Sequence, residues 1–256
     1  MRTLAPHPAL ETPPDHALRA DLAACFRWTV KLNWHEAVAN HFSARTEGRR
    51  FLMNPDKMHF ARVRASDLIE YDAEDADTMD RDDAPDHTAW GLHGAIHRRT
   101  DHKVAMHLHT RFATALASLA DSSLPPIDQN TAQFFNRVAV DEDYGGLAFE
   151  EEGERVCALL EDPKVKVLVM GNHGVLAVGE TPAQCFNTIY YFERACETYL
   201  TALSTGRALR VLNAQIAEKT AREAGSEATK DGTPAAEKHL AELRLLLDAE
   251  GSDYAD

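Results

Sequence analysis

Apolar and polar positions alternate along the chain with periods that switch between those of helices and those of strands. Val165–Met170 form an almost wholly apolar run, which is typical of a strand buried on both faces. The expected helices cover residues 17–32, 88–99, 112–119, 149–160, 181–203 and 239–247, and the expected strands cover residues 41–45, 51–54, 103–110, 135–139, 165–170 and 175–178. This order, with its short hairpin links, predicts a three-layer α/β domain around a mixed, mostly antiparallel sheet.

The segments between these elements are polar. Residues 70–86 hold nine acidic residues and one basic residue without an apolar period, which favours a solvated loop. Residues 220–236 are small and polar and are expected to form a mobile connector. Beyond it, leucines along one stripe of residues 239–247 predict a C-terminal helix that docks on the body or on a neighbouring subunit. The proline-rich residues 1–14 are expected to be a flexible arm, which leaves residues 15–256 as a single domain.

Composition narrows the classes of function. A formal charge of −14 on 256 residues disfavours nucleic acid and anionic membrane surfaces as partners. No apolar run approaches the roughly 20 residues of a membrane helix, and the first residues lack the pattern of a signal peptide, so we expect a cytoplasmic protein. The cysteines stand singly in apolar patterns and are expected to be reduced packing residues: Cys25, Cys157, Cys185 and Cys196.

The sharpest chemical feature is a pair of histidines at the end of an apolar strand pattern. His107 and His109 are two residues apart, so both imidazoles face the same side of a strand. His173, in a Gly-Asn-His-Gly turn, offers a third imidazole. Three neutral histidines with open positions are a catalytic pattern for Zn²⁺, and Fe, Mn and Co are also compatible. Spacing fixes faces but not coordination, so hydrogen-bonded core histidines remain the alternative at this point.

Five motifs occur in order along the chain: Asn40–Arg45, Phe51–Pro55, Leu92–Arg99, His107–Thr110 and Asn172–Val175. Together they resemble the class II aldolase/adducin family, in particular its bacterial adducin-like branch, from about residue 17 to the end. The resemblance implies an α/β/α domain, commonly a homotetramer with active sites at subunit interfaces. It also implies a divalent metal, with zinc the first expectation, on the three histidines named above.

The resemblance further implies a metal-dependent lyase. An aldolase or decarboxylase of this kind acts on a small hydroxy-carbonyl or keto-acid substrate through a metal-stabilised enolate, because a dication held by neutral ligands keeps its charge for a developing oxyanion. The substrate pocket would be lined by Asn40, His41, Ser43 and Asn54.

Two positions depart from the family pattern. Ala89 lies four residues before His93, where the family's aldolases carry a general-base glutamate, and Gln129 stands where a neighbouring subunit supplies a tyrosine acid. Each such group contributes roughly 10²- to 10⁴-fold to a rate, so other residues would have to replace them. The candidates are Asp86, His87, His41, Asp128 and Tyr144. We expect His93 to be structural and His97 to lie at the surface.

Three functions remain open from the sequence. Decarboxylation needs an electron sink but no base to begin cleavage, so the absence of a general base at Ala89 impairs this reaction least. The same three histidines could hold Fe(II) in a non-haem oxygenase, although the familiar iron site also contains a carboxylate. A non-catalytic interaction domain, as in adducin, is the third possibility, but a scaffold has no chemical need to gather three imidazoles.

Overall fold

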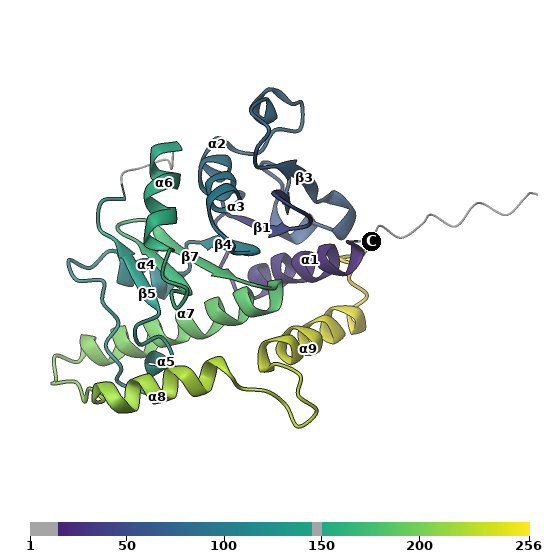
Figure 1. Ribbon diagram of the computed structural model, residues 1–256. Helices are drawn as coiled ribbons and strands as arrows, with labels where there is room; N and C mark the ends of the chain where they lie inside the picture. The colour runs from purple at the N-terminus through teal and green to yellow at the C-terminus, as the bar shows by residue number, and fades with distance from the viewer. Residues whose placement is uncertain (1–14, 145–149) are drawn as a thin grey trace, which may run out of the picture.

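One seven-stranded sheet organises the protein, and the computed structural model describes residues 15–144 and 150–256 of it (Figure 1). The strands are β1 (His41–Arg45), β2 (Arg50–Met53), β3 (Ile69–Asp72), β4 (Val104–Leu108), β5 (Val138–Asp141), β6 (Val167–Met170) and β7 (Gly174–Gly179). Their spatial order is β3-β2-β1-β4-β7-β6-β5, and only β5 and β6 pair in parallel. The expected mixed, mostly antiparallel sheet is confirmed, while the arm expected at residues 1–14 lies outside the described residues.

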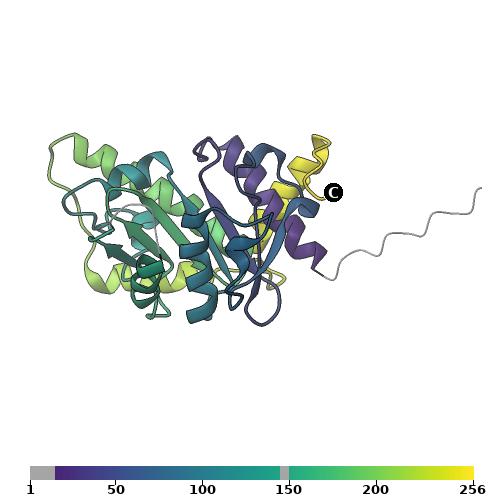
Figure 2. The same cartoon turned by 90° about the horizontal axis from the view of Figure 1, so that it is seen from above.

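Helices cover both faces of this sheet (Figure 1). The α-helices are α1 (His16–Lys31), α2 (His87–Ala89), α3 (Ala95–Arg99), α4 (Arg111–Ala117), α5 (Gln129–Ala132), α6 (Glu150–Leu159), α7 (Pro182–Ser204), α8 (Ala214–Gly225) and α9 (Ala235–Ala249), with short helical turns η1 (Phe60–Arg62), η2 (Ala65–Asp67), η3 (Thr78–Asp80) and η4 (Trp90–Gly94). Helices α1, α7 and α9 lie on one face, and α3 and α6 lie on the other. Figure 2 shows α1 and α9 side by side at one end of the molecule. None of the helices in the described ranges is long and apolar enough to cross a membrane.

Strand β4 divides its side chains between the two layers, as strand geometry requires. Met106 and Leu108 pack in the apolar cluster formed with α1 and α7, whereas Ala105 packs toward α3 and α6. His107 therefore shares the α3 and α6 side of the sheet with Ala105. Strand β6 is buried along its whole length and contributes to clusters on both faces, which confirms the doubly buried strand expected here, although it begins at Val167 and not at residue 165.

The acidic segment was wrongly expected to be a loop throughout, because its first residues form the edge strand β3. Tyr71 is fully buried and pairs with Phe51 of β2, while Glu70 and Asp72 are only partly buried. An edge strand with one covered face needs few apolar residues, so an acidic composition does not exclude it.

Two further boundaries differ from expectation. Strand β5 begins at Val138 rather than at residue 135, because Asn136 adopts a left-handed conformation (φ 56°) that interrupts extended backbone. Helix α8 reaches Gly225 and so takes the first part of the connector expected at residues 220–236. Its buried Ala217 and Ala221 face the body, since small residues at helical spacing pack closely even in a polar sequence.

A π-helical turn, η4, lies between α2 and α3 within the helix expected at residues 88–99. Helix α6 packs tightly against it: a side chain at Gly153 would overlap the Gly91 carbonyl oxygen. π-turns of this kind are frequent at functional sites because they re-aim the side chains around them. Here the turn carries His93 and leads into His97, and both side chains are fully buried beneath the sheet.

Candidate functional site

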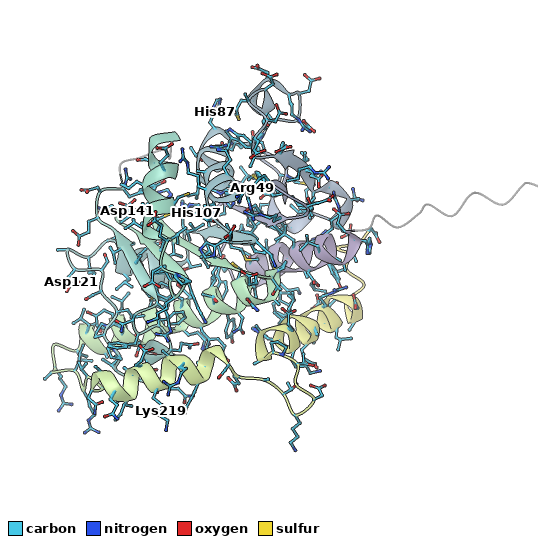
Figure 3. The ribbon with its side chains drawn as sticks, viewed as in Figure 1. Arg49, His87, His107, Asp121, Asp141 and Lys219 are labelled. Carbon is cyan, nitrogen blue, oxygen red and sulfur yellow. The ribbon has the colours of Figure 1, made fainter. Side chains whose placement is uncertain are left out.

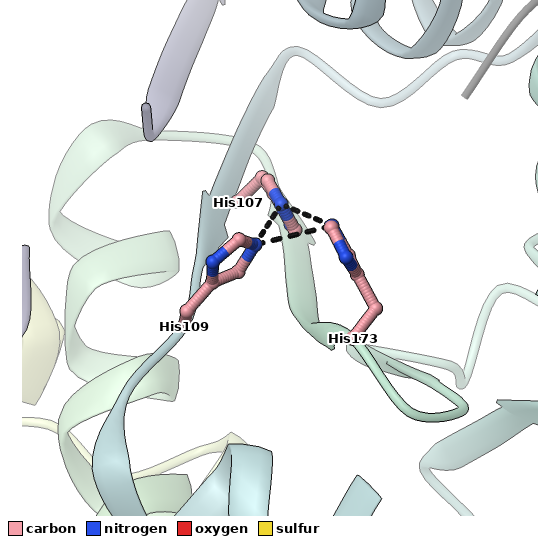
Figure 4. Close-up of side chains that lie close together, drawn as sticks. All are labelled: His107, His109 and His173. Atoms are coloured by element: carbon pink, nitrogen blue, oxygen red, sulfur yellow. Dashed lines mark hydrogen bonds between the residues drawn. The ribbon is translucent and has the colours of Figure 1, made fainter. Parts of the chain in front are cut away.

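Three imidazoles converge where β4 ends and β7 begins (Figure 4). His107 lies on β4, His109 follows that strand, and His173 precedes β7. Their Nε2 atoms are 2.9 Å apart between His107 and His109 and 3.1 Å apart in the other two pairs. The antiparallel pairing of β4 with β7 closes the 64-residue gap in sequence, because Leu108 lies opposite Val175.

The second nitrogens of two of these rings face hydrogen-bond acceptors. His107 Nδ1 donates to the Val175 carbonyl oxygen at 3.0 Å, and His109 Nδ1 donates to the Glu36 carboxylate at 2.5 Å. Carbonyl and carboxylate oxygens only accept, so the proton of each neutral ring is on Nδ1. The Nε2 lone pairs of both rings therefore point into the space that the three histidines share. This is the usual outer-shell arrangement of metal-ligating histidines.

The geometry fits a single cation. A triangle with sides near 3.0 Å has its corners about 1.7 Å from its centre, so one ion lying off the plane can reach all three nitrogens at the roughly 2.0–2.1 Å typical of Zn–N bonds. Burial lowers the pKa of His107, and burial and the neighbouring His109 lower the pKa of His173 to about 4. Neutral rings are the form that binds metal. The Nε2 lone pairs of His107 and His109 face each other and repel, and a cation between them removes this repulsion.

Two rings flank the trio. Tyr144 stacks on His173 with ring centroids 4.5 Å apart, and burial raises the pKa of its phenol well above the ordinary value. His41 of β1 lies directly opposite His107 in the strand register, and their ring centroids are 5.0 Å apart. The structure therefore brings two of the sequence-predicted site residues, Tyr144 and His41, to the three histidines.

A small pocket adjoins this centre. Its polar lining comes from three loops and β1 and includes Asn40, His41, Asn54, Lys57 and Asp86, with Ala89 beside them. The Asn40 Nδ2 amide is buried without a hydrogen-bond partner, while its Oδ1 accepts from the Glu36 backbone nitrogen. Asn54 Oδ1 accepts from the Phe42 backbone nitrogen. An unpaired buried donor at a pocket wall is costly unless a ligand or water completes it.

Two carboxylates line this pocket, Asp56 and Asp86, and Lys57 pairs with both of them. Asp86 accepts from Lys57 Nζ at 2.6 Å and also caps α2 through Thr88. Burial would raise the pKa of Asp86, but the hydrogen bonds from Lys57 and Thr88 outweigh it and hold that pKa well below its ordinary value. Ala89, which stands where the resemblance places the family's general-base glutamate, contributes only a methyl group to the pocket.

Other predicted residues lie elsewhere. Ser43 is fully buried, and its Oγ contacts His93 and His97, so it does not line the pocket. His87 is exposed and lies well away from His107 (Figure 3). Asp128 caps α5 by accepting from the Thr131 backbone nitrogen. The structure does not bring these three side chains to the centre within one chain. The expectation that His97 lies at the surface was wrong, since it is fully buried.

The sequence reading missed three supporting residues. Glu36 fixes the His109 ring, and Lys57 holds Asp86. Glu193 of α7 is buried and accepts from Thr110 Oγ1 and from two backbone nitrogens at the start of α4, immediately after His109. Each lies far in sequence from the group that it holds, so no local pattern marks it. A lone acidic residue on the otherwise apolar face of α7 was the one available signal.

Comparison with known proteins identifies the family. The model of the Class II Aldolase and Adducin N-terminal domain matches residues 20–200. A putative aldolase class 2 protein of Caulobacter vibrioides is 34% identical over 209 residues, covering 80% of this chain and 79% of that protein. Alpha-adducin of Rattus norvegicus is 30% identical over 73% of this chain, which spans 26% of the adducin. A Streptomyces roseochromogenus protein named 4-hydroxy-3-prenylphenylpyruvate oxygenase/4-hydroxy-3-prenylbenzoate synthase is 31% identical over 68% of this chain and 62% of its own length.

Solved structures of similar proteins have the same fold. An aldolase II superfamily protein from Pseudomonas syringae superposes with a TM-score of 0.82 at 29% identity, covering 95% of this chain and 97% of that chain. L-fuculose 1-phosphate aldolase from Glaciozyma antarctica PI12 has a TM-score of 0.77 at 22% identity and covers 98% of this chain and 96% of its own, a likeness of fold alone. The chain belongs to the class II aldolase and adducin family.

Proposed function

We propose that this protein is a divalent-metal-dependent lyase that acts on a small hydroxy-carbonyl or keto-acid substrate. One observation carries the proposal: three histidine Nε2 atoms face one another at 2.9–3.1 Å, and outer hydrogen bonds turn the lone pairs of two of them inward. His107, His109 and His173 would hold the cation, for which zinc is the first candidate and Mn, Fe and Co are alternatives. When bound, the cation would supply Lewis-acid stabilisation of negative charge on a substrate oxygen.

The pocket residues would position that substrate. Asn40 has a free amide donor, and His41 lines the same pocket beside His107. A carboxylate, carbonyl or hydroxyl oxygen would satisfy the Asn40 donor, which is otherwise left unpaired. Tyr144 covers one side of the His173 ring, so it would help to exclude water from the substrate. Ser43, by contrast, would not touch the substrate, because its Oγ contacts His93 and His97.

Within this class, decarboxylation is favoured over aldol cleavage that begins with proton removal. Ala89 has no carboxylate, and Asp86 is held by Lys57 and by the first turn of α2 with a depressed pKa. A strongly engaged carboxylate is a weak base. Loss of CO₂ leaves its electron pair on the substrate without prior proton abstraction, so it requires the cation but not the missing glutamate.

A second candidate uses the same three histidines for iron. The Streptomyces relative that is 31% identical is named an oxygenase and a benzoate synthase. An Fe(II) oxygenase on this trio would consume O₂ with its substrate, whereas the lyase would react equally well without O₂. A homotetramer is also proposed from the family resemblance, and light scattering on the purified protein measures it directly.

Metal analysis tests the proposal first. We expect close to one tightly held transition metal per chain, and His107→Ala should remove it while circular dichroism stays unchanged. His102→Ala is the matched control, because His102 is a half-buried histidine whose contact is the Leu160 carbonyl oxygen outside the trio. A metal-free protein that also fails to bind Zn, Mn, Fe or Co on reconstitution would refute the enzyme and favour an adducin-like interaction domain.

Activity of the loaded protein then separates the two reactions. A panel of keto acids and hydroxy-carbonyl compounds is incubated with and without O₂, and CO₂, aldehyde products and O₂ uptake are measured. CO₂ or aldehyde release independent of O₂ supports the lyase. Product formation only with O₂ uptake supports the oxygenase.

A further inference from the structure

A continuous line of hydrogen bonds runs from the pocket into the protein behind β1. His41 Nδ1 lies 2.8 Å from His93 Nε2, and His93 Nδ1 lies 2.5 Å from Ser43 Oγ. Ser43 Oγ in turn lies 2.7 Å from His97 Nε2. All four side chains are buried, and no acidic group takes part in these three contacts. We call this set, His41, His93, Ser43 and His97, the histidine line.

The three rings of the histidine line are neutral. Burial lowers the pKa of His97 to about 3 and holds the pKa of His93 well below the ordinary value. His41 is buried too, and its hydrogen-bond partner among the described residues is a histidine and not an acidic group, so a positive charge on its ring would lack a hydrogen-bonded counter-ion. A neutral imidazole has one N–H donor and one acceptor nitrogen, and a hydroxyl donates one hydrogen bond. Each of the three contacts therefore contains one hydrogen. The Ser43 hydroxyl can accept two hydrogen bonds, but its contacts among the described residues are the two in the line, so its own hydrogen is left without an acceptor unless it donates to His93 or His97. Once Ser43 donates within the line, the direction of one contact fixes the direction of the others.

Only two arrangements satisfy this count. In the first, every ring has its proton on Nδ1: His41 donates to His93, His93 donates to Ser43, and Ser43 donates to His97. The Nε2 of His41 is then a bare acceptor. In the second, every ring has its proton on Nε2, and each donation runs the opposite way. The Nε2–H of His41 is then a donor, and none of the described residues gives that nitrogen a hydrogen-bond partner.

The inner end of the line distinguishes the arrangements. His97 Nδ1 is buried without a hydrogen-bond partner. The first arrangement leaves an N–H group orphaned there, whereas the second leaves only a lone pair. Orphaned buried N–H groups are rarer in native proteins than under-satisfied acceptors, so the second arrangement is the more stable. Asp86 favours it too, because this carboxylate lines the same pocket as His41 and its charge attracts an N–H more strongly than the neighbouring Lys57 ammonium repels it.

We propose that Ser43, His93 and His97 are positioning residues that hold His41 in its Nε2–H tautomer, so that His41 donates a hydrogen bond to an oxygen of the bound substrate. The inference rests on the proposed function for its ligand and makes that ligand more specific. Asn40 Nδ2 and His41 Nε2–H are two donors on one pocket wall, so the group between them is an acceptor such as a carboxylate or carbonyl oxygen. His41 is then a donor to the substrate rather than the missing general base.

Nitrogen-15 NMR of the metal-free protein, labelled at histidine, reports the tautomer of each ring. Two rings calibrate the experiment: His102 faces the Leu160 carbonyl through Nε2, and His107 faces the Val175 carbonyl through Nδ1, so their tautomers must be opposite. We expect His41, His93 and His97 all to carry their proton on Nε2. Protons on Nδ1 in all three rings, or a mixture of tautomers along the line, would overturn the inference.

A variant at Ser43 tests whether the tautomer of His41 depends on the rest of the histidine line. Ser43→Ala removes the side-chain hydrogen bonds that join His93 to His97 in the described residues, so we expect His41 to lose its single tautomer and populate both. Ser122→Ala is the control, since Ser122 is also buried and its Oγ donates to the Leu119 carbonyl, which is not part of the line. An unchanged His41 signal in Ser43→Ala would refute the coupling, and the measurement on the unaltered protein stands even if the variant fails to fold.

This experiment can fail independently of the proposed function, because it is made without metal. Nε2–H tautomers in a protein that binds no metal would overturn the lyase and leave the histidine line intact. Metal binding together with Nδ1–H tautomers would overturn the inference about the histidine line and leave the proposed lyase function standing. With an accepted substrate, Ser43→Ala should raise KM more than it lowers kcat, because the bond it weakens is made by the bound substrate before reaction.

Discussion

Gly174 gives the sharpest test of how β7 supports the metal centre. It follows His173, and a Cβ added to it would lie 2.6 Å from His109 Cδ2 and 2.6 Å from the Leu108 carbonyl oxygen. Ordinary contacts begin near 3.4 Å, so Gly174→Ala must displace these atoms by about 0.8 Å. The Leu108 carbonyl belongs to the central strand β4 and cannot rotate away, so the His109 ring and the strand must both shift.

Two effects follow from this displacement. Overpacking of this kind costs roughly 1–3 kcal/mol of unfolding free energy. Metal–ligand distances vary by only about ±0.2 Å in well-formed sites. We therefore expect the affinity for Zn²⁺ to fall on the order of 10- to 100-fold, as it does when an outer-shell partner of a ligand is lost. Urea unfolding and chelator competition measure the two quantities.

Gly179→Ala, at the other end of the same strand, is the matched control. Its added Cβ would meet no atom closer than 3.6 Å, which is ordinary contact. We expect its stability to stay within about 0.5 kcal/mol of the parent or to rise slightly, with unchanged metal affinity. Equal zinc affinity in Gly174→Ala and Gly179→Ala would show that the ring positions do not depend on the glycine, and the reasoning would fail.

Three further predictions use other parts of the structure. Glu193→Ala leaves three donors at the start of α4 unpaired, two of them in buried hydrogen bonds, and should cost about 3–5 kcal/mol in urea unfolding; a loss below 1 kcal/mol would show that water replaces the carboxylate. Because the pKa values of His41 and His97 are about 3 in the folded protein and near 6.5 when unfolded, the unfolded chain takes up protons that the native state does not. Stability should therefore fall as pH drops below about 6.5, by roughly 1.4 kcal/mol per pH unit for each ring, and His97→Gln should reduce that slope. All four cysteines are buried, and burial raises the pKa of Cys157 to about 11, so a thiol reagent should label none of them quickly in the native protein and all of them in urea; rapid native labelling would contradict their packing role.

Local sequence pattern determined much of the fold and part of the site. The alternation around His107 and His109 placed both rings on one face, because successive strand side chains point to opposite sides. The apolar run of β6 and the capped start of α7 were predicted for similarly local reasons, since burial on both faces and an N-cap threonine leave direct marks in the sequence. The family motifs carried the same information about order along the chain.

Tertiary structure alone decided which groups meet. His173 reaches the pair only through the register of β7 on β4, and Glu36, Lys57 and Glu193 each act on residues at least 29 positions away. The burial of His97 also depends on the packing of α3 beneath β1 and β2, where Ser43 and Phe51 contact its ring. Periodicity fixes the face on which a side chain lies, whereas strand pairing and layer packing fix which residues that face contacts. A site made across strands is therefore set by long-range contacts that no local pattern encodes.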